Sequence, residues 1–263
     1  MYHMKNLSTA RFLPLLQFAF LGLLMISVQA EEKAYQEVEF ASLDGLKVTA
    51  DVYASSNDPS KPFIILCHQA RWSRGEYREI APKLNKLGFN CMAIDQRSGD
   101  SVNDVENETA ARADLTKKGQ KYVDAEQDII AAIQYAKKKL AKGKLILWGS
   151  SYSSSLVIRI AAEHPDMVDG SLSFAPGEYF KNQGKSADWI TSSAKKIKCP
   201  VFITSAKNEE KNWANIYKAI PTKTKEKFLP TSKGNHGSRA LWEEFDDHTQ
   251  YWKATTGFLA QFL

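Results

Sequence analysis

A possible nucleophile stands where an apolar run meets a cluster of small residues. The run covers residues 145–148, and Gly149-Ser150-Ser151-Tyr152-Ser153 follows it directly. A buried strand that turns sharply into a helix through small residues can hold one side chain out at the top of a sheet, in a strained backbone conformation. Ser151 occupies this place, and we predict that its hydroxyl attacks a carbonyl carbon.

A serine hydroxyl is a poor nucleophile at neutral pH and needs a base to take its proton, and that base needs a third group to fix its tautomer. Of the five histidines, His3 lies at the start of the chain, His164 precedes a proline, and His248 falls within a predicted terminal helix. His236 stands in the loop Lys233-Gly234-Asn235-His236-Gly237, where the flanking glycines let the backbone bend. His236 is therefore the predicted base.

The pattern around Ser151 resembles the nucleophile elbow of the α/β-hydrolase family, Gly-x-Ser-x-Gly, with Ser153 in place of the second glycine. A second segment, Asp95-Gln96-Arg97-Ser98-Gly99-Asp100-Ser101, resembles the Asp-x-Arg-Gly-x-Gly-x-Ser turn of the same family. The resemblance implies that an acid and then the histidine follow the serine along the chain. It places the acid at Glu209, directly after a predicted strand, with Glu210 as the alternative.

The same resemblance implies two backbone N–H donors for the negative charge that develops on the attacked carbonyl oxygen. One is the N–H of Tyr152, the residue after the nucleophile. The other belongs to the turn Cys67-His68-Gln69-Ala70, which resembles the family's His-Gly-x segment with glutamine in place of glycine. We expect Ala70 to donate, with Gln69 as the alternative, and we interpret His68 as a structural residue of this turn.

The elements that must position these residues alternate between strands and helices. Asp44-Gly45 favours a tight reversal between strands at residues 38–40 and 48–53, which predicts an antiparallel hairpin at the start of the domain. After it, apolar runs indicate buried parallel strands, and segments with helical spacing separate them. This order predicts an α/β fold with a doubly wound, mostly parallel sheet. The further strands are expected at 63–67, 91–94, 144–148, 171–175, 201–205 and 228–229, and the helices at 76–87, 123–140, 156–163 and 241–263.

Two connecting segments bear on the size of the substrate. Residues 102–121 are polar and are expected to form a loop with some helix, whereas residues 176–198 leave room for a small insertion and not for a helical lid. A minimal lid is similar to that of the compact dienelactone-hydrolase-like and small-esterase members of the family, including peptidase-like relatives. The aromatic residues expected to line a pocket for a small substrate are Trp72, Tyr152, Tyr179 and Trp189.

Residues 1–30 are typical of a secretory signal peptide. A basic start, an apolar stretch over residues 12–28 and the small residues of Val28-Gln29-Ala30 fit the pattern that a signal peptidase recognises. An uncleaved anchor helix is the alternative. We expect cleavage before Glu31, which leaves a single α/β-hydrolase domain over residues 31–263, secreted or periplasmic and without stable membrane insertion.

The charge balance and the cysteines argue against several other classes of protein. The formal net charge is +5 at pH 7 with acids and bases interspersed, which gives no reason to expect nucleic acid or a membrane surface as a partner. Cys67, Cys91 and Cys199 each adjoin a predicted strand and are expected to remain thiols. No Cys-x-x-Cys or His-x-x-x-His spacing is present in the sequence, so we expect no metal and no cofactor.

Together these features predict an exported serine hydrolase that cleaves carboxylic esters of small substrates through an acyl-enzyme. The predicted triad is Ser151, His236 and Glu209. One alternative is a serine peptidase of the same fold, because the same triad can act on an amide. The other is a catalytically inactive member that binds a small molecule or a partner in the same cleft.

Overall fold

An eight-stranded sheet forms the centre of this computed structural model, which describes residues 1–2, 34–54 and 58–263. The strand order is β1-β2-β4-β3-β7-β8-β9-β10. β2 pairs antiparallel with β1 and with β4, and all other neighbours in this sheet pair parallel, which confirms the predicted fold class. The strands are β1 (Gln36–Ala41), β2 (Lys47–Tyr53), β3 (Phe63–Cys67), β4 (Asn90–Ile94), β7 (Leu145–Ser150), β8 (Gly170–Phe174), β9 (Val201–Thr204) and β10 (Lys225–Phe228).

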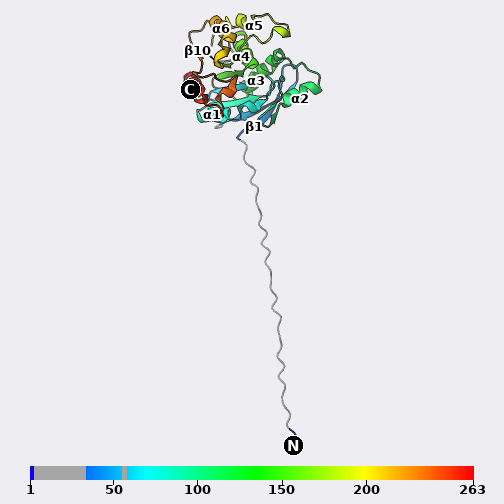
Figure 1. The fold of residues 1–263 in the computed structure, drawn as a ribbon. Helices are drawn as coiled ribbons and strands as arrows, with labels where there is room; N and C mark the ends of the chain where they lie inside the picture. Colours follow the sequence, from blue (N-terminus) through cyan, green and yellow to red (C-terminus); the bar gives the residue numbers. More distant parts are fainter. Residues whose placement is uncertain (3–33, 55–57) are drawn as a thin grey trace. The chain divides into compact units, whose positions relative to one another are not determined.

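Helices pack on both faces of the sheet (Figure 1). Along β3, Phe63 and Ile65 join the core that contains residues of α3 to α6, while Ile64 and Leu66 join the core that contains residues of α1 and α7. Successive side chains of a strand point to opposite faces, so a strand covered on both faces is apolar throughout. The helices are α1 (Ile80–Lys86), α3 (Glu126–Lys139), α4 (Tyr152–Glu163), α5 (Trp189–Ala194), α6 (Glu210–Ala219) and α7 (His248–Leu259).

The polar segment after β4 has its own small structure. It contains a two-stranded ribbon, β5 (Ser101–Val102) with β6 (Val105–Glu106), and helix α2 (Glu108–Leu115). Asn107 caps this helix, because its side-chain oxygen accepts the N–H of Ala110 at 2.8 Å. The segment is therefore ordered and contains one helix.

Two helices lie where none was predicted, and several helices begin at other residues than predicted, the terminal one above all. α5 and α6 lie where no helix was predicted, and α6 buries only Trp213 and Ile216, too few for a clear apolar stripe. The terminal helix begins at His248 instead of residue 241. Residues Ser238–Leu241 form the 3₁₀ helix η5. The next residue, Trp242, donates its indole N–H to the carbonyl oxygen of Glu76 at 3.0 Å, and this packing interrupts the helical path.

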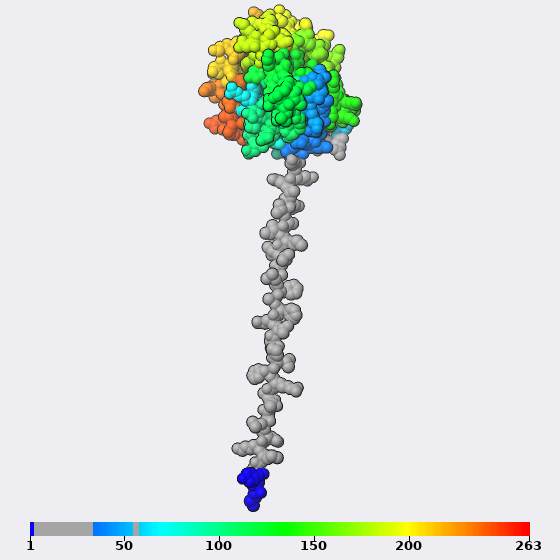
Figure 2. Space-filling model, turned by 90° about the vertical axis from the view of Figure 1, so that its right-hand side faces the viewer, coloured from blue at the N-terminus to red at the C-terminus, as the bar shows by residue number. Residues whose placement is uncertain are grey.

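The first strand lies beside α3 on one side of the molecule, where blue and green surfaces adjoin (Figure 2). Phe40 of β1 stacks on Tyr135 of α3, with ring centroids 4.9 Å apart. The described residues 34–263 belong to one compact unit, and none of their helices is long and apolar enough to cross a membrane. Apart from residues 1–2, the predicted signal peptide lies outside the described residues.

Candidate active site

Ser151 stands at the sharp turn between β7 and α4, as predicted for a nucleophile elbow. Its backbone has φ 57° and ψ −121°, which is a strained conformation for a residue with a side chain. The turn is also tight. A Cβ atom on Gly149 would lie 2.5 Å from the backbone nitrogen and Cα of Ser154, so only glycine fits before the elbow.

Ser153, which stands where the family pattern has glycine, is held in place by the hydrogen bonds of its hydroxyl group, whose one proton faces two carbonyl oxygens. Its hydroxyl oxygen accepts the N–H of Ser150 at 2.9 Å and lies 2.8 Å from the carbonyl oxygen of Cys67 and 2.9 Å from that of Ser150. The serine therefore fits the turn and links the elbow to the end of β3. The departure from glycine leaves the elbow intact.

Glu209 and His236 meet directly. His236 Nδ1 lies 2.6 Å from Glu209 Oε1, and both side chains are partly buried. Glu209 ends the 3₁₀ helix η4 (Lys207–Glu209) that follows β9, and its other oxygen accepts the N–H of Ala206 at 3.2 Å. The N–H of Lys207 donates to the carbonyl oxygen of Lys233 at 2.9 Å, which joins the loop of the acid to the loop of the histidine.

The histidine loop is held at the elbow through the residue before the nucleophile. The N–H of Ser238 donates to the hydroxyl oxygen of Ser150 at 2.8 Å. Gly237, between His236 and Ser238, has φ 73°, and a Cβ atom on it would lie 2.5 Å from the same hydroxyl oxygen. The loop can approach the elbow this closely because residue 237 is glycine.

Tyr179 lies beside the Ser151 side chain in this structure. Among the described residues, no hydrogen bond joins Ser151 to His236. The Tyr179 hydroxyl donates to the carbonyl oxygen of Ala175 at 2.7 Å. Burial raises the pKa of Tyr179, and a hydrogen bond with the Ser151 side chain acts in the opposite direction. Tyr179 is thus a neutral hydroxyl group beside the predicted nucleophile.

The predicted oxyanion turn has a fixed orientation. The N–H of Gln96 donates to His68 Nε2 at 3.0 Å, so the proton of this imidazole sits on Nδ1, which donates to the carbonyl oxygen of Gln69 at 2.7 Å. Burial lowers the pKa of His68 to about 4, so the ring is neutral, and it serves as the structural residue that we expected. In a trans peptide the N–H points away from the carbonyl, so this bond aims the N–H of Ala70 away from His68.

The backbone N–H groups of Ala70 and Tyr152, the two oxyanion donors predicted from the sequence, differ from that of Gln69 in their hydrogen bonding. The N–H of Gln69 is already bonded, because it donates to Glu76 Oε2 at 2.8 Å. The N–H groups of Ala70 and Tyr152 have no acceptor within the part of the chain that the structure describes. Ala70 rather than Gln69 therefore has a free donor in this turn.

Of the four aromatic residues expected around a pocket, Tyr179 lies beside Ser151, and the rings of the other three pack against other side chains. Trp72 stacks on Trp242 with ring centroids 5.2 Å apart. The ring of Tyr152 is buried and stacks on Tyr122 at 4.5 Å. For Trp189 the contacts are the edge of Phe180 at 4.8 Å and the guanidinium group of Arg159, 4.3 Å from the ring centroid.

The Asp95–Ser101 turn is held by buried ion pairs. Arg97 is buried, and its guanidinium group lies 2.7 Å from Asp128 and 2.8 Å from Asp44. Asp95 lies 2.6 Å from the guanidinium group of Arg74. This family-like turn therefore has a supporting role next to the site.

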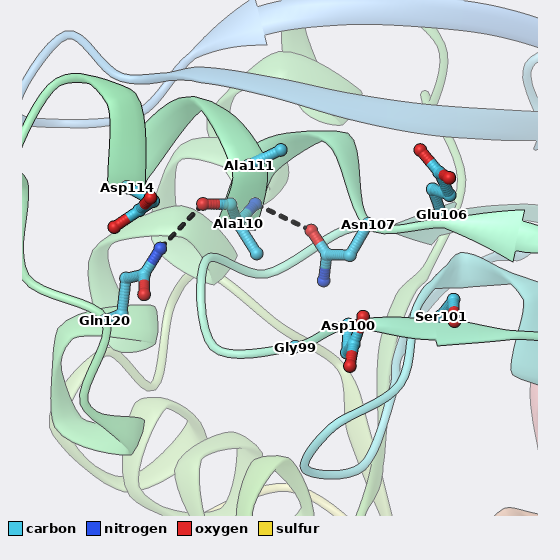
Figure 3. Close-up of a pocket in the computed structure, with 9 residues that line it drawn as sticks. All are labelled: Gly99, Asp100, Ser101, Glu106, Asn107, Ala110, Ala111, Asp114 and Gln120. Carbon is cyan, nitrogen blue, oxygen red and sulfur yellow. Dashed lines mark hydrogen bonds between the residues drawn. The ribbon is translucent and has the colours of Figure 1, made fainter.

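A surface recess of about 310 Å³ lies beside α2 (Figure 3). Asp100, Glu106 and Asp114 line it, and Gln120 closes one side by donating its amide N–H to the carbonyl oxygen of Ala110 at 2.6 Å. The lining includes none of the predicted triad residues. We do not assign this acidic recess to the candidate active site.

Sequence reasoning missed one buried residue of this region, Glu76. It lies in the 3₁₀ helix η1 (Arg74–Tyr77) with no exposed surface, and it contacts both the oxyanion turn and the elbow. In the sequence it stands at the first position of a predicted helix, where an acidic residue usually faces solvent. Only its contacts with residues far along the chain reveal it.

The sheet order, the flanking helices and the strained serine between β7 and α4 define a hydrolase of the α/β fold. Residues 58–212 match the family described as "Serine aminopeptidase, S33", and the chain belongs to this family. No curated protein sequence matches it significantly.

Two solved structures of the same fold align with this chain over almost their full length. An esterase of Pyrococcus furiosus is 17% identical with a TM-score of 0.62, over 87% of this chain and 92% of the esterase. A dienelactone hydrolase from Anabaena variabilis is 16% identical with a TM-score of 0.65, over 88% of this chain and 100% of that protein.

Dipeptidyl peptidase 4 of Porphyromonas gingivalis is 15% identical with a TM-score of 0.63, over 87% of this chain and 35% of the peptidase. At these identities the likeness shows the shared fold.

Proposed function

We propose that this protein is a serine hydrolase that cleaves esters of small carboxylic acids, with Ser151, His236 and Glu209 as its catalytic triad. The observation that carries the proposal is the 2.6 Å contact between His236 Nδ1 and Glu209, in a loop that is bonded to the residue before Ser151. The esterase and the dienelactone hydrolase of the same fold support the class of reaction.

The proposed reaction begins with the tautomer of His236. A carboxylate only accepts, so Glu209 favours the proton on Nδ1 and leaves Nε2 free to take the proton of Ser151. Because no hydrogen bond joins Ser151 to His236 among the described residues, the Ser151 side chain must first rotate toward Nε2 of His236. Its oxygen then attacks the ester carbonyl.

The N–H groups of Tyr152 and Ala70 stabilise the resulting oxyanion. His236 returns the proton to the departing alcohol, which leaves an acyl group on Ser151. A water molecule, deprotonated by the same imidazole, then attacks the acyl-enzyme. The acid is released and the serine regains its proton. These steps use only groups of this chain and water.

We propose a short acyl group because the segment over residues 176–198 is small. Its helix α5 is anchored by Glu178, whose carboxylate accepts the N–H groups of Ile190 and Thr191 at 3.0 and 2.8 Å. An added methylene gains about 0.8 kcal/mol only where apolar wall covers it. kcat/KM for p-nitrophenyl esters should therefore be greatest from acetate to butyrate. A steady rise through octanoate would refute the short-chain proposal.

Peptide cleavage is the second candidate function, favoured by the description of the matched family and by the peptidase of the same fold. Aminoacyl p-nitroanilides test it alongside the p-nitrophenyl esters. Faster turnover of the anilides, with the same loss in Ser151→Ala, would make the peptidase reading the better one. We also propose export, on the basis of residues 1–30.

A further inference from the structure

The Glu76 carboxylate joins two of the loops that build the proposed site. Oε2 accepts the N–H of Gln69 at 2.8 Å, and Oε1 accepts the hydroxyl proton of Ser150 at 2.7 Å. Gln69 precedes the proposed oxyanion donor Ala70, and Ser150 precedes the proposed nucleophile. The buried Glu76 side chain thus holds both the residue before Ala70 and the residue before Ser151.

The third loop is reached through the Ser150 hydroxyl. Its oxygen accepts the N–H of Ser238 at 2.8 Å while its proton is donated to Glu76. Ser238 follows His236 by two residues, and Gly237 between them packs against the same hydroxyl oxygen. The chain of bonds from Gln69 to Ser238 therefore runs through Glu76 and spans the oxyanion turn, the elbow and the histidine loop.

This arrangement places a carboxyl group in the interior without an ion pair to any lysine or arginine of the described residues. Burial of an unpaired acid costs free energy, and this burial raises the pKa of Glu76 to about 7. The hydrogen bonds from Ser150 and from the N–H of Gln69 act in the opposite direction and lower that pKa.

The other titratable groups around Glu76 stay neutral. Burial raises the pKa of Cys67, of Tyr77 and of Tyr152 well above the usual range, and the Glu76 charge adds to each rise.

We propose that Glu76 is a positioning residue that holds the oxyanion turn, the nucleophile elbow and the histidine loop together. The kinetic part of this inference rests on the proposed function. The structural part is the set of hydrogen bonds that joins Gln69 to Glu76, Glu76 to Ser150 and Ser150 to Ser238, which we call the tie. The tie does not depend on any activity. Glu76 acts through these neighbours and does not itself contact the reacting atoms.

The test compares Glu76→Gln and Ser150→Ala with a control, Glu79→Gln. Glu79 lies three residues further along the chain, is partly exposed, and accepts the N–H of Glu243 at 3.1 Å, so its substitution leaves the tie intact. Ser150→Ala removes the hydroxyl that links Glu76 to Ser238 and supplies a second variant if Glu76→Gln folds poorly. Thermal unfolding establishes that each purified variant is folded.

Amide hydrogen exchange measures the tie without any substrate. We expect exchange about tenfold faster at Gln69 in Glu76→Gln and at Ser238 in Ser150→Ala, with both amides unchanged in Glu79→Gln. Unchanged exchange at both amides in the two tie variants overturns the inference, whether or not the protein proves to be a hydrolase.

Ester hydrolysis then measures the consequence for the reaction. In both tie variants kcat should fall by about tenfold or more while KM changes less than about threefold, because the positioning serves the transition state. Wild-type kcat in a folded Glu76→Gln variant would contradict the role, whereas an inactive wild type would contradict the proposed function alone.

Discussion

The imidazole of His236 lies 2.6 Å from Glu209, while the adjacent acid, Glu210, lies 2.7 Å from the ammonium group of Lys227. Two neighbouring carboxylates thus point to different partners. The two carboxylates point in different directions because Glu209 is the last residue of η4 and Glu210 is the first residue of α6.

Glu209→Ala should therefore lower kcat by about 10³–10⁴-fold, because His236 loses the group that sets its tautomer and stabilises its charge. Glu210→Ala removes only an exposed ion pair and should leave kcat within about threefold of wild type. Steady-state hydrolysis of p-nitrophenyl acetate compares the two. Equal losses in both variants would disprove the assignment of the acid.

Gly237→Ala should impair the site because the added Cβ meets Ser150 Oγ at 2.5 Å. The histidine loop must then move away from the elbow, and we expect kcat to fall by about tenfold or more. Gly45→Ala is the matched control, since Gly45 also has positive φ but has nothing within 4 Å of an added Cβ. Both variants should lose some thermal stability from backbone strain, but only Gly237→Ala should lose activity. Full activity in Gly237→Ala would show that the close packing is unimportant.

The central strands and the elbow were predictable because their local pattern reflects their environment. Residues 63–67 and 145–148 are apolar throughout since helices cover both faces of the sheet. β10 was harder to predict because it is an edge strand with charged, partly exposed residues, so only its end at Phe228 was apolar enough to indicate a strand.

Residues whose role depends on distant contacts could not be predicted. Glu76 meets Ser150 across 74 positions of sequence, and no local spacing indicates that pairing. Tyr179 was predicted only as one of several aromatic residues near a pocket, and the structure distinguishes it by its hydrogen bond to Ala175 and its place beside Ser151.

Stability should depend on pH through His68. Its pKa is about 4 in the folded protein and about 6.5 when the ring is exposed, so the unfolded chain binds the proton first as the pH falls. Stability from this group is complete above pH 6.5 and decreases by up to about 1.4 kcal/mol per pH unit between 6.5 and 4.

Urea unfolding from pH 7 to pH 4 tests this dependence in wild type and His68→Gln. The variant should be less stable at pH 7, and its deficit relative to wild type should shrink as the pH falls. Comparing the two proteins cancels the opposite contributions of Glu76 and Asp95, whose pKa values are raised by burial. A constant deficit across this range would mean that His68 titrates normally in the folded state.

Export predicts a specific N-terminus. The protein recovered outside the cytoplasm should begin at Glu31, because Val28-Gln29-Ala30 provides the small residues that a signal peptidase requires. Intact-mass spectrometry of that protein checks the prediction. Membrane-bound protein that still carries Met1 would support the anchor helix instead.

The central claim is that Ser151 is the nucleophile, and covalent labelling tests it most directly. A fluorophosphonate probe should modify the folded wild-type protein at one residue, and peptide mapping by mass spectrometry should place the adduct on Ser151. Ser151→Ala should remain folded, should not be labelled, and should lose ester hydrolysis by several orders of magnitude, about 10³-fold or more. An adduct on Ser150 or Ser153, or a folded wild-type protein that takes up no probe and hydrolyses no ester, would contradict the account.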